Sequence, residues 1–309
     1  MIVTVTPNPS IDRTVRIGRL LPGELVRATA ATAEAGGKGV NIARVLAAQG
    51  RATVAVVPLS AASRPVFAGL LGGMATLAPV RIARDVRVNV SLIEADGRIT
   101  KVNEPGPELT AAEAASVLRR AATLARGAEW VVGTGSLPPG APIDFYARLG
   151  RALPAGCRYA VDADGEPLRA AFGARVDLVK PNHAELERLV GRSLPTLGDV
   201  VDAAEEVRRD GPAAVLVSLG PDGALLVDAD GRTHAEARID DVDNTVGAGD
   251  ALLGGFLAAG ADHAALRTAV AWSVAACRSP GTQVRVVERR DLEVVIVHAA
   301  VVTTRRLAA

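Results

Sequence analysis

The chain has 309 residues, of which 49% are hydrophobic, and its formal net charge is +1. This length allows one large α/β domain or two smaller ones, and the near-neutral charge argues against binding to nucleic acid or to a membrane surface. No run of 18 apolar residues occurs and the N-terminus follows a strand pattern, so we expect a cytoplasmic protein. The 2 cysteines and 4 histidines predict neither a disulfide framework nor a ligand set for a metal.

Short β-rich runs alternate with longer segments of helical periodicity along most of the chain. This alternation predicts a mostly parallel sheet with helices on both faces. In such a fold, ligands bind at the carboxyl ends of the strands. The predicted strands are 2–6, 53–57, 129–133, 158–162, 176–179 and 214–218, and the predicted helices are 40–49, 111–126, 143–151, 183–190, 199–210, 249–259 and 263–277.

Two stretches depart from this alternation and predict an additional small sheet. Residues 87–93 alternate polar and apolar side chains, turn at Asp96-Gly97, and return through residues 99–102, which is typical of a hairpin with one solvated face. Residues 13–17 and 25–33 can supply further strands.

The remaining signals concern the C-terminal third. The segment Asp228 to Gly231 predicts another hairpin turn. The run 294–297 fits either a strand or a final packed helix, and the end of the chain around Arg305 is expected to fray. Because no linker or repeat is visible, we expect residues 1–309 to form a single domain.

The segment 245–250, Thr-Val-Gly-Ala-Gly-Asp, sets two glycines and a carboxylate where a loop becomes a helix. The backbone N–H groups of Gly247, Ala248 and Gly249 should therefore form an anion-binding helix N-terminus. An aspartate beside such a turn, Asp250, suits phosphoryl transfer, in which a carboxylate takes a proton from the attacking hydroxyl. An ordinary capping turn with an acidic first-turn residue explains the same residues equally well.

A second glycine cluster, Gly36-Gly37-Lys38-Gly39-Val40-Asn41, begins another helical pattern. This segment combines an anion-binding turn with the cation of Lys38 and the side-chain amide of Asn41. The spacing is not that of a P-loop, and neither cluster fits the dinucleotide-binding fingerprint. A Rossmann cofactor site is therefore not expected.

Together, the two clusters resemble the two signatures of the ribokinase/PfkB family of carbohydrate kinases. Segments 4–12, 135–140, 179–186 and 217–224 match its phosphosugar branch in order, and the similarity runs from residue 2 to about Gly281-Thr282. The resemblance implies a ribokinase-like α/β fold with a β-sheet lid from about 12–34 and 86–104. It also implies a kinase that uses ATP and Mg²⁺, with two copies able to pair through the lid.

The resemblance implies a role for several residues. In the catalytic group, Asp250 would act as base while Gly247, Ala248 and Gly249 stabilise the transferring phosphoryl group. Asp12, Gly37 and Asn41 would contact sugar hydroxyls, Lys38, Arg27 and Arg87 would hold a phosphate on the substrate, and Ser136 would line the same cleft. Lys180, Asn182, Ser218, Gly220 and Gly223 would bind ATP, and Asn182 and Glu185 would hold magnesium through water. The spacing of Asn182 and Glu185 alone also fits a helix capping box.

Segments 7–14 and 100–109 resemble most those of 1-phosphofructokinases. The expected reaction is therefore phosphorylation of fructose 1-phosphate to fructose 1,6-bisphosphate. The alternatives are a tagatose-6-phosphate kinase, a 6-phosphofructokinase, or a regulatory protein that binds a sugar phosphate without catalysis. One departure from the family is Ser60-Ala61-Ala62-Ser63, where relatives carry a glycine pair.

Overall fold

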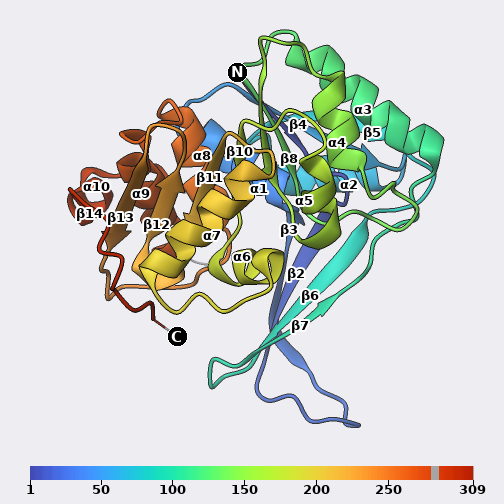
Figure 1. Cartoon of the computed structure of the whole chain (residues 1–309). Helices are drawn as coiled ribbons and strands as arrows, with labels where there is room; N and C mark the ends of the chain where they lie inside the picture. Colours follow the sequence, from blue (N-terminus) through green and yellow to red (C-terminus); the bar gives the residue numbers. More distant parts are fainter. Residues whose placement is uncertain (280–284, 309) are drawn as a thin grey trace.

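The computed structural model describes residues 1–279 and 285–308, so Gly281 and Thr282 lie outside the described residues. A large sheet with helices on both sides forms the body, and a smaller sheet projects from it (Figure 1). In the described residues, the large sheet has ten strands in the order β14 (Val295–Val297), β13 (Arg232–Ala237), β12 (Ala224–Val227), β11 (Ala214–Ser218), β10 (Leu178–Val179), β9 (Arg158–Asp162), β8 (Trp130–Thr134), β1 (Ile2–Val5), β4 (Thr53–Leu59) and β5 (Thr76–Arg81).

The strands from β5 to β11 run parallel, whereas β11, β12, β13 and β14 pair antiparallel. The predicted α/β architecture, with a mostly parallel sheet and a separate small sheet, is confirmed. The ambiguous run 294–297 is a strand at the sheet edge, and the predicted turn at Asp228 closes the β12–β13 hairpin through Asp228 N–H and Gly231 O at 3.0 Å. No helix in the described parts of the chain combines the length and apolar character needed to cross a membrane.

Side chains alternate between the two faces of the sheet and build two cores. In β1, Val3 and Val5 face one core while Ile2 faces the other. Helices α3 (Ala111–Ala125), α4 (Phe145–Ala152), α5 (Gly165–Ala171), α6 (His183–Val190) and α7 (Leu197–Arg209) cover the first face, and α1 (Lys38–Ala48), α8 (Ala248–Ala258), α9 (Ala265–Cys277) and α10 (Arg289–Glu293) cover the second.

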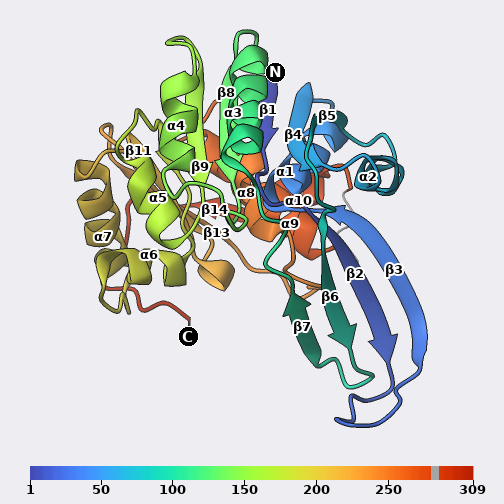
Figure 2. The same ribbon diagram turned by 90° about the vertical axis from the view of Figure 1, so that its right-hand side faces the viewer.

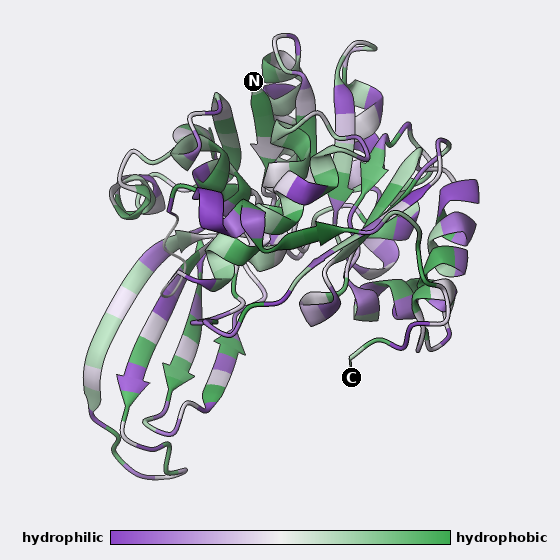
Figure 3. Cartoon of the chain, turned by 90° about the vertical axis from the view of Figure 1, so that its left-hand side faces the viewer, coloured by the Kyte–Doolittle hydropathy of each residue, from purple (hydrophilic) through white to green (hydrophobic). Residues whose placement is uncertain are grey.

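The smaller sheet contains β3 (Ala28–Gly36), β2 (Ser10–Ile17), β6 (Arg87–Ile93) and β7 (Ile99–Asn103), in that order. Figure 2 shows these strands extending away from the body, and we call this sheet the lid. Apolar and polar residues alternate along its strands (Figure 3). At its base, Ala35 packs beside Phe67 and Leu71 of α2 (Ser63–Leu71) in a third, smaller core.

Several elements escaped sequence analysis. Strand β5 contains Pro79, which is tolerated because β5 lies at the edge of the sheet. Helix α2 has Pro65 in its first turn and ends at the left-handed Gly72, so its pattern is short and interrupted. Helix α5 likewise begins beside a proline, Pro167.

The C-terminal segment contradicts the prediction that it frays. The Arg305 side chain forms ion pairs with Asp222 and Glu236, and the Arg305 carbonyl accepts a hydrogen bond from Leu197 N–H at 2.9 Å. A backbone bridge also joins Arg306 to Thr196. The segment is therefore fixed along the N-terminus of α7.

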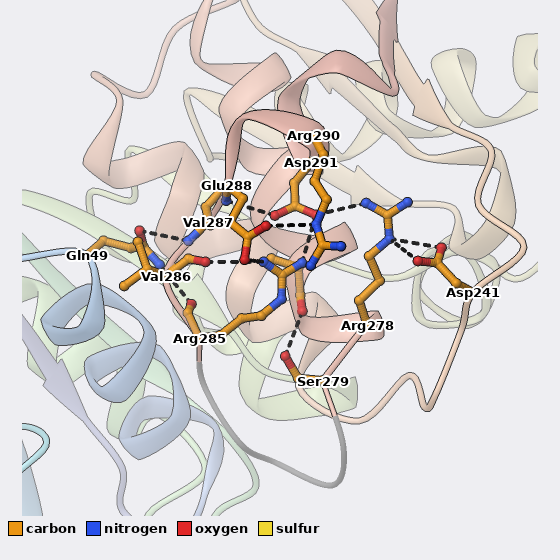
Figure 4. A network of polar contacts seen from close by, with 11 residues as sticks. Gln49, Asp241, Arg278, Ser279, Arg285, Val286, Val287, Glu288, Arg290 and Asp291 are labelled. Carbon is orange, nitrogen blue, oxygen red and sulfur yellow. Dashed lines mark hydrogen bonds and ion pairs between the residues drawn. The ribbon is translucent and has the colours of Figure 1, made fainter.

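A buried carboxylate, that of Asp291 in α10, joins the end of α9 to the residues just before α10. Its Oδ1 accepts hydrogen bonds from Arg278 Nη1 at 2.9 Å and from Arg285 Nη2 at 2.7 Å (Figure 4). Gln49 Nε2 donates to the carbonyl of Arg285 at 3.0 Å. This network ties α9 and α10 to the end of α1.

Candidate active site

The two glycine clusters meet in space at the N-termini of α1 and α8. Gly247, the N-cap of α8, has the left-handed φ of 80°, and Asp250 lies in the first turn with only 8% of its surface exposed. Asn41 of α1 donates from Nδ2 to Asp250 Oδ2 at 2.9 Å. Residues separated by more than 200 positions thus hold one carboxylate at a helix N-terminus.

The surroundings of Asp250 raise its pKa to about 6, chiefly through burial and secondly through the nearby charge of Asp162. The hydrogen bond from Asn41 and the charges of Lys38 and Lys180 oppose this rise. A carboxyl group with this pKa is mostly ionised at neutral pH, yet it is a stronger base than an exposed aspartate. It therefore suits general-base catalysis.

Asp162, at the carboxyl end of β9, lies between two lysines and is 1% exposed. Its Oδ1 contacts Lys38 Nζ at 2.9 Å and its Oδ2 contacts Lys180 Nζ at 3.5 Å. Burial alone would raise the pKa of Asp162, but the two lysines outweigh that effect and lower it. Sequence analysis missed Asp162, although an acidic residue ending a predicted parallel strand was an available signal.

Lys38 also lies 3.8 Å from Oε1 of Glu185. Burial alone would lower the pKa of Lys38, but Asp162, Glu185 and Asp250 together raise it, so this side chain is cationic. The α8 N-terminus is adjacent as well, because a Cβ placed on Gly249 would lie 3.6 Å from Lys180 Nζ.

Asn182 and Glu185 form the capping box that their spacing allows. Asn182 Oδ1 accepts from Glu185 N–H at 2.8 Å, and Glu185 Oε2 accepts from Asn182 N–H at 2.8 Å. The capping box uses only Oε2 of Glu185, whereas Oε1 of the same carboxylate faces Lys38. No group of three or more His, Cys, Asp or Glu able to hold a metal occurs among the described residues.

The predicted nucleotide-binding residues follow the next strand of the sheet. Ser218 ends β11 and pairs with Asn182 across a backbone bridge. Gly220 begins the short turn η1 (Gly220–Asp222) and Gly223 follows it, with φ values of 58° and 84°. Gly223 lies tightly against β13, since a Cβ there would lie 2.1 Å from the carbonyl oxygen of Ala235.

A cleft of about 870 Å³ opens at the base of the lid, lined among others by Gly37, Lys38, Arg87, Ser136 and Glu185. Five of the predicted site residues therefore border one cavity.

Arg87 contacts backbone on both sides of the cleft entrance. It donates to the carbonyl of Glu104 at 2.9 Å and to that of Asn8 at 3.2 Å. The Asn8 side chain in turn donates to the Pro105 carbonyl at 3.0 Å and to Ser136 Oγ at 3.2 Å. Asn8 was absent from our candidate residues, and it joins the end of the lid to the loop that carries Ser136.

Asp12 lies on the lid strand β2, where Ser10 Oγ and Asn89 Nδ2 donate to its Oδ1 at 2.7 and 2.9 Å. The position of the carboxylate requires a glycine on the neighbouring strand β3, because a Cβ on Gly36 would lie 2.2 Å from Asp12 Oδ2. The carboxylate is thus held at the base of the lid.

Arg27 lies away from the cleft, so the predicted cluster of three cations does not form within one chain. It precedes Ala28, which pairs with Ile17, whereas Ser10 pairs with Gly36 at the opposite end of the same strands. At 3.3 Å per residue, roughly 20 Å separates these ends. Sequence spacing could not show on which end of a strand pair a loop residue falls.

The residues that replace the family's glycine pair form the turn into α2. The Oγ of Ser60 accepts from Ser63 N–H at 2.9 Å, and Ser63 Oγ donates to Asp85 Oδ1 at 3.0 Å. Ser63 Oγ also accepts from Val86 N–H at 3.1 Å, so this turn holds the segment immediately before Arg87.

The pfkB family carbohydrate kinase profile matches residues 6–288. The chain belongs to this family. Among its curated relatives, the 1-phosphofructokinase of Xanthomonas campestris is 38% identical over 85% of each chain. The 1-phosphofructokinase of Haloferax volcanii is 37% identical over 99% of each chain. The family signatures identified in the sequence are thus confirmed as marks of a sugar kinase.

A solved structure, phosphofructokinase-2 from Escherichia coli in complex with potassium, superposes with a TM-score of 0.85 at 33% identity. The match covers 94% of this chain and 96% of that one. The fold and the family therefore agree over nearly the whole molecule.

The raised pKa of Asp250 predicts a pH-dependent stability. Because the pKa is about 6 in the folded protein and 3.8 ordinarily, folding disfavours the ionised form. The free-energy cost of ionising Asp250 in the folded protein is absent below pH 3.8, its ordinary pKa, and is fully present above about pH 6. Asp250→Asn should therefore increase the free energy of unfolding by about 2–3 kcal/mol at pH 8, and by progressively less toward pH 4.

Urea denaturation of both proteins across this pH range measures the difference. Asp230→Asn, which removes the same charge from the exposed β12–β13 turn, is the matched control and should show no such trend. An equal gain for Asp250→Asn at all pH values would attribute the effect to packing instead of ionisation.

Proposed function

We propose that the protein is an ATP- and magnesium-dependent kinase that phosphorylates the 6-hydroxyl of fructose 1-phosphate. The observation that carries this proposal is the buried carboxylate of Asp250, with its raised pKa, at the glycine-rich N-terminus of α8. Family membership and the names of the two relatives support the reaction class and the substrate.

In the proposed reaction, Asp250 accepts the proton of the 6-hydroxyl as the hydroxyl oxygen attacks the γ-phosphorus of ATP. The bond from the γ-phosphorus to the β–γ bridging oxygen breaks, and the products are ADP and fructose 1,6-bisphosphate. The N–H groups of Gly247, Ala248 and Gly249 would stabilise the negative charge on the transferring group. Lys38 and Lys180 add positive charge at the same end of the cleft.

The other end of the cleft would hold the phosphate already on the sugar. Arg87 lines the cleft beside Ser136, and a guanidinium contacts phosphate in bidentate fashion. Asp12, Gly37 and Asn41 would contact the sugar hydroxyls between the two ends. Lys38 belongs with the reacting end in this proposal, since its partners are Asp162 and Glu185.

The oxygen ligands at the reacting end fit magnesium, which prefers oxygen and retains much of its water. Oε1 of Glu185 would hold the ion through water, with Asn182 fixing that side chain through the capping box. When bound with ATP, magnesium would neutralise part of the phosphate charge. Ser218, Gly220 and Gly223 would form the nucleotide side of the site.

A 6-phosphofructokinase is the second candidate, because the structure also superposes on phosphofructokinase-2 of E. coli. In that case, the sugar would bind with its phosphate again at Arg87 and its 1-hydroxyl at Asp250. The chemistry at Asp250 is the same for both substrates.

We further propose that two copies pair through the lid. The registers of β2, β6 and β7 place Val15, Val90, Leu92 and Val102 on one lid face, while Asp12 and Asn89 lie on the opposite face. Val102 is 57% exposed in the single chain. Burying this apolar face against a second copy would remove it from water.

The first prediction tests the base. Asp250→Asn should lower kcat by about 10²–10⁴ because the hydroxyl then loses its proton acceptor. The wild-type kcat/KM should also fall as pH drops below about 6, where Asp250 becomes protonated. Steady-state assays of ADP release measure both effects. Near wild-type turnover in the variant, with Asp230→Asn as the control, would reject Asp250 as base.

The second prediction tests the phosphate site. Arg87→Ala should reduce kcat/KM for fructose 1-phosphate by about tenfold or more, since a charge-assisted contact to phosphate is worth about 1.5–3 kcal/mol. Free fructose and ATP should be little affected.

Arg84→Ala, at a nearby exposed arginine paired with Glu108, is the matched control. Assays on fructose 1-phosphate, fructose 6-phosphate, tagatose 6-phosphate and fructose also rank the candidate substrates. An equal loss on all four would exclude a phosphate contact by Arg87.

The third prediction tests the pairing. Val90→Asp should shift the sedimentation coefficient from that of a dimer to that of a monomer, because a charge would be buried in an apolar contact. Ser91→Asp adds the same charge to the opposite lid face and should leave the dimer intact. A monomeric wild type, or equal sedimentation of both variants, would contradict pairing through this face.

A further inference from the structure

The turn η1 is held from behind by the C-terminal segment, in an arrangement that the proposed chemistry does not use. Arg305 Nη2 donates to Asp222 Oδ1 at 2.8 Å and to Glu236 Oε2 at 2.6 Å. The Ala308 N–H donates to the other oxygen of Asp222 at 2.6 Å. One arginine thus joins the last residue of η1 to a residue of β13.

Both carboxylates are buried, with side-chain exposures of 9% for Asp222 and 6% for Glu236. Because they contact the same nitrogen, they are near neighbours and would repel each other without the cation between them. The Arg305 hydrogen bond is the main cause that lowers the pKa of Glu236 to about 2. Glu236 is therefore ionised at neutral pH, and the shared arginine determines how closely the two carboxyl groups approach.

Two histidines complete the support. His234 Nε2 donates to the Asp222 carbonyl at 2.8 Å, and His298 Nε2 donates to Glu236 Oε1 at 3.0 Å. Their rings stack with centroids 4.9 Å apart and planes inclined by only 6°. The backbone and the side chain of Asp222 are thus both fixed by elements that follow it in the chain.

The position of η1 relative to β13 has little freedom to adjust. The Cβ that Gly223 lacks would lie 2.1 Å from the Ala235 carbonyl oxygen and 2.6 Å from Glu236 Cα, so the turn packs directly on β13. A hydrogen bond from Leu219 N–H to the Gly223 carbonyl at 2.8 Å closes the turn. Asp222 and Gly223 are therefore both held against β13, and these contacts set the backbone of η1.

We infer that Arg305 is a positioning residue for the nucleotide, acting through Asp222 and Glu236 to set the backbone of η1. The inference rests on the proposed function, in which Gly220 and Gly223 contact ATP. Arg305 approaches η1 from the side of β13 and the chain end, whereas Asp250 and Arg87 belong to other elements. Its loss should therefore weaken the nucleotide and spare the sugar.

The test compares wild type with Arg305→Ala, Arg305→Lys and the matched control Arg306→Ala, which alters the exposed neighbour in the same segment. Steady-state kinetics give kcat and the two KM values, and calorimetry gives the Kd of ADP independently of turnover. Arg305→Ala should raise the KM for ATP and the Kd for ADP about tenfold, as expected for a displaced binding element. The kcat and the KM for fructose 1-phosphate should stay within about twofold.

Arg305→Lys keeps the charge, but its ammonium stands on a shorter stem than the Nη2 atom that contacts both carboxylates, so its effect should be intermediate. Arg306→Ala should match wild type. Should Arg305→Ala fail to fold, Arg305→Lys and Glu236→Gln decide the question, since each weakens the bridge while retaining a polar side chain of similar size.

Unchanged ATP and ADP constants in the soluble Arg305 variants would overturn the inference, as would an equal change in both KM values and kcat. A wild-type protein that neither binds ADP nor releases it from ATP in the presence of any of the sugar phosphates would instead overturn the proposed function. The two failures are therefore distinguishable.

Discussion

The arrangement of the site depends on the burial of one carboxylate, that of Asp162, between two lysines. An isolated buried carboxylate would be costly, so Asp162 requires cations that reach it from other elements. Lys38 comes from the N-terminus of α1 and Lys180 from the segment after β10. The ion cluster therefore fixes α1 and the α6 entrance against the end of β9. Lys180 also lies beside Gly249, which extends the same constraint to α8.

This ion cluster also explains why the pKa of Asp162 is lowered while that of the nearby Asp250 is raised. The two lysines contact Asp162 directly and lower its pKa, whereas Asp250 is buried with an amide partner and is influenced by the charge of Asp162. One aspartate is thereby a permanent anion that organises cations. The other has a pKa near the range in which a base works best. Their different partners assign the two roles.

The sequence predicted the parts of the molecule that have strong local signals. Alternating strand and helix patterns predicted the parallel sheet and its two helical layers, and the family resemblance of the glycine clusters assigned both Asn41 and Asp250 to the sugar. Short or proline-containing elements such as β5 and α2 lack such a signal. Their conformation depends on packing at the edge of the sheet and under the lid, which a local pattern does not report.

The site residues that sequence analysis misplaced or missed likewise depend on contacts between distant parts of the chain. Arg27 and Arg87 both carry the charge that phosphate requires, but only the register of β2 with β3 shows that Arg27 lies at the far end of the lid. Arg305 was assigned to a fraying end because its partners, Asp222 and Glu236, are about 70–80 residues earlier in the chain. Asp162 was overlooked because its meaning depends on lysines from two other segments. Long-range pairing decided each case.

The central place of β1 has a consequence for how the chain folds. Its four residues pair on one side with β4, about 50 residues later, and on the other side with β8, which begins at Trp130. During synthesis, this apolar strand therefore lacks its second partner until β8, more than 120 residues later in the chain, has also been made. Loop closure over such distances is slow, and an unpaired apolar strand can associate with other chains meanwhile. The strand that ends beside the active-site cleft thus keeps one edge uncovered until a distant part of the chain pairs with it.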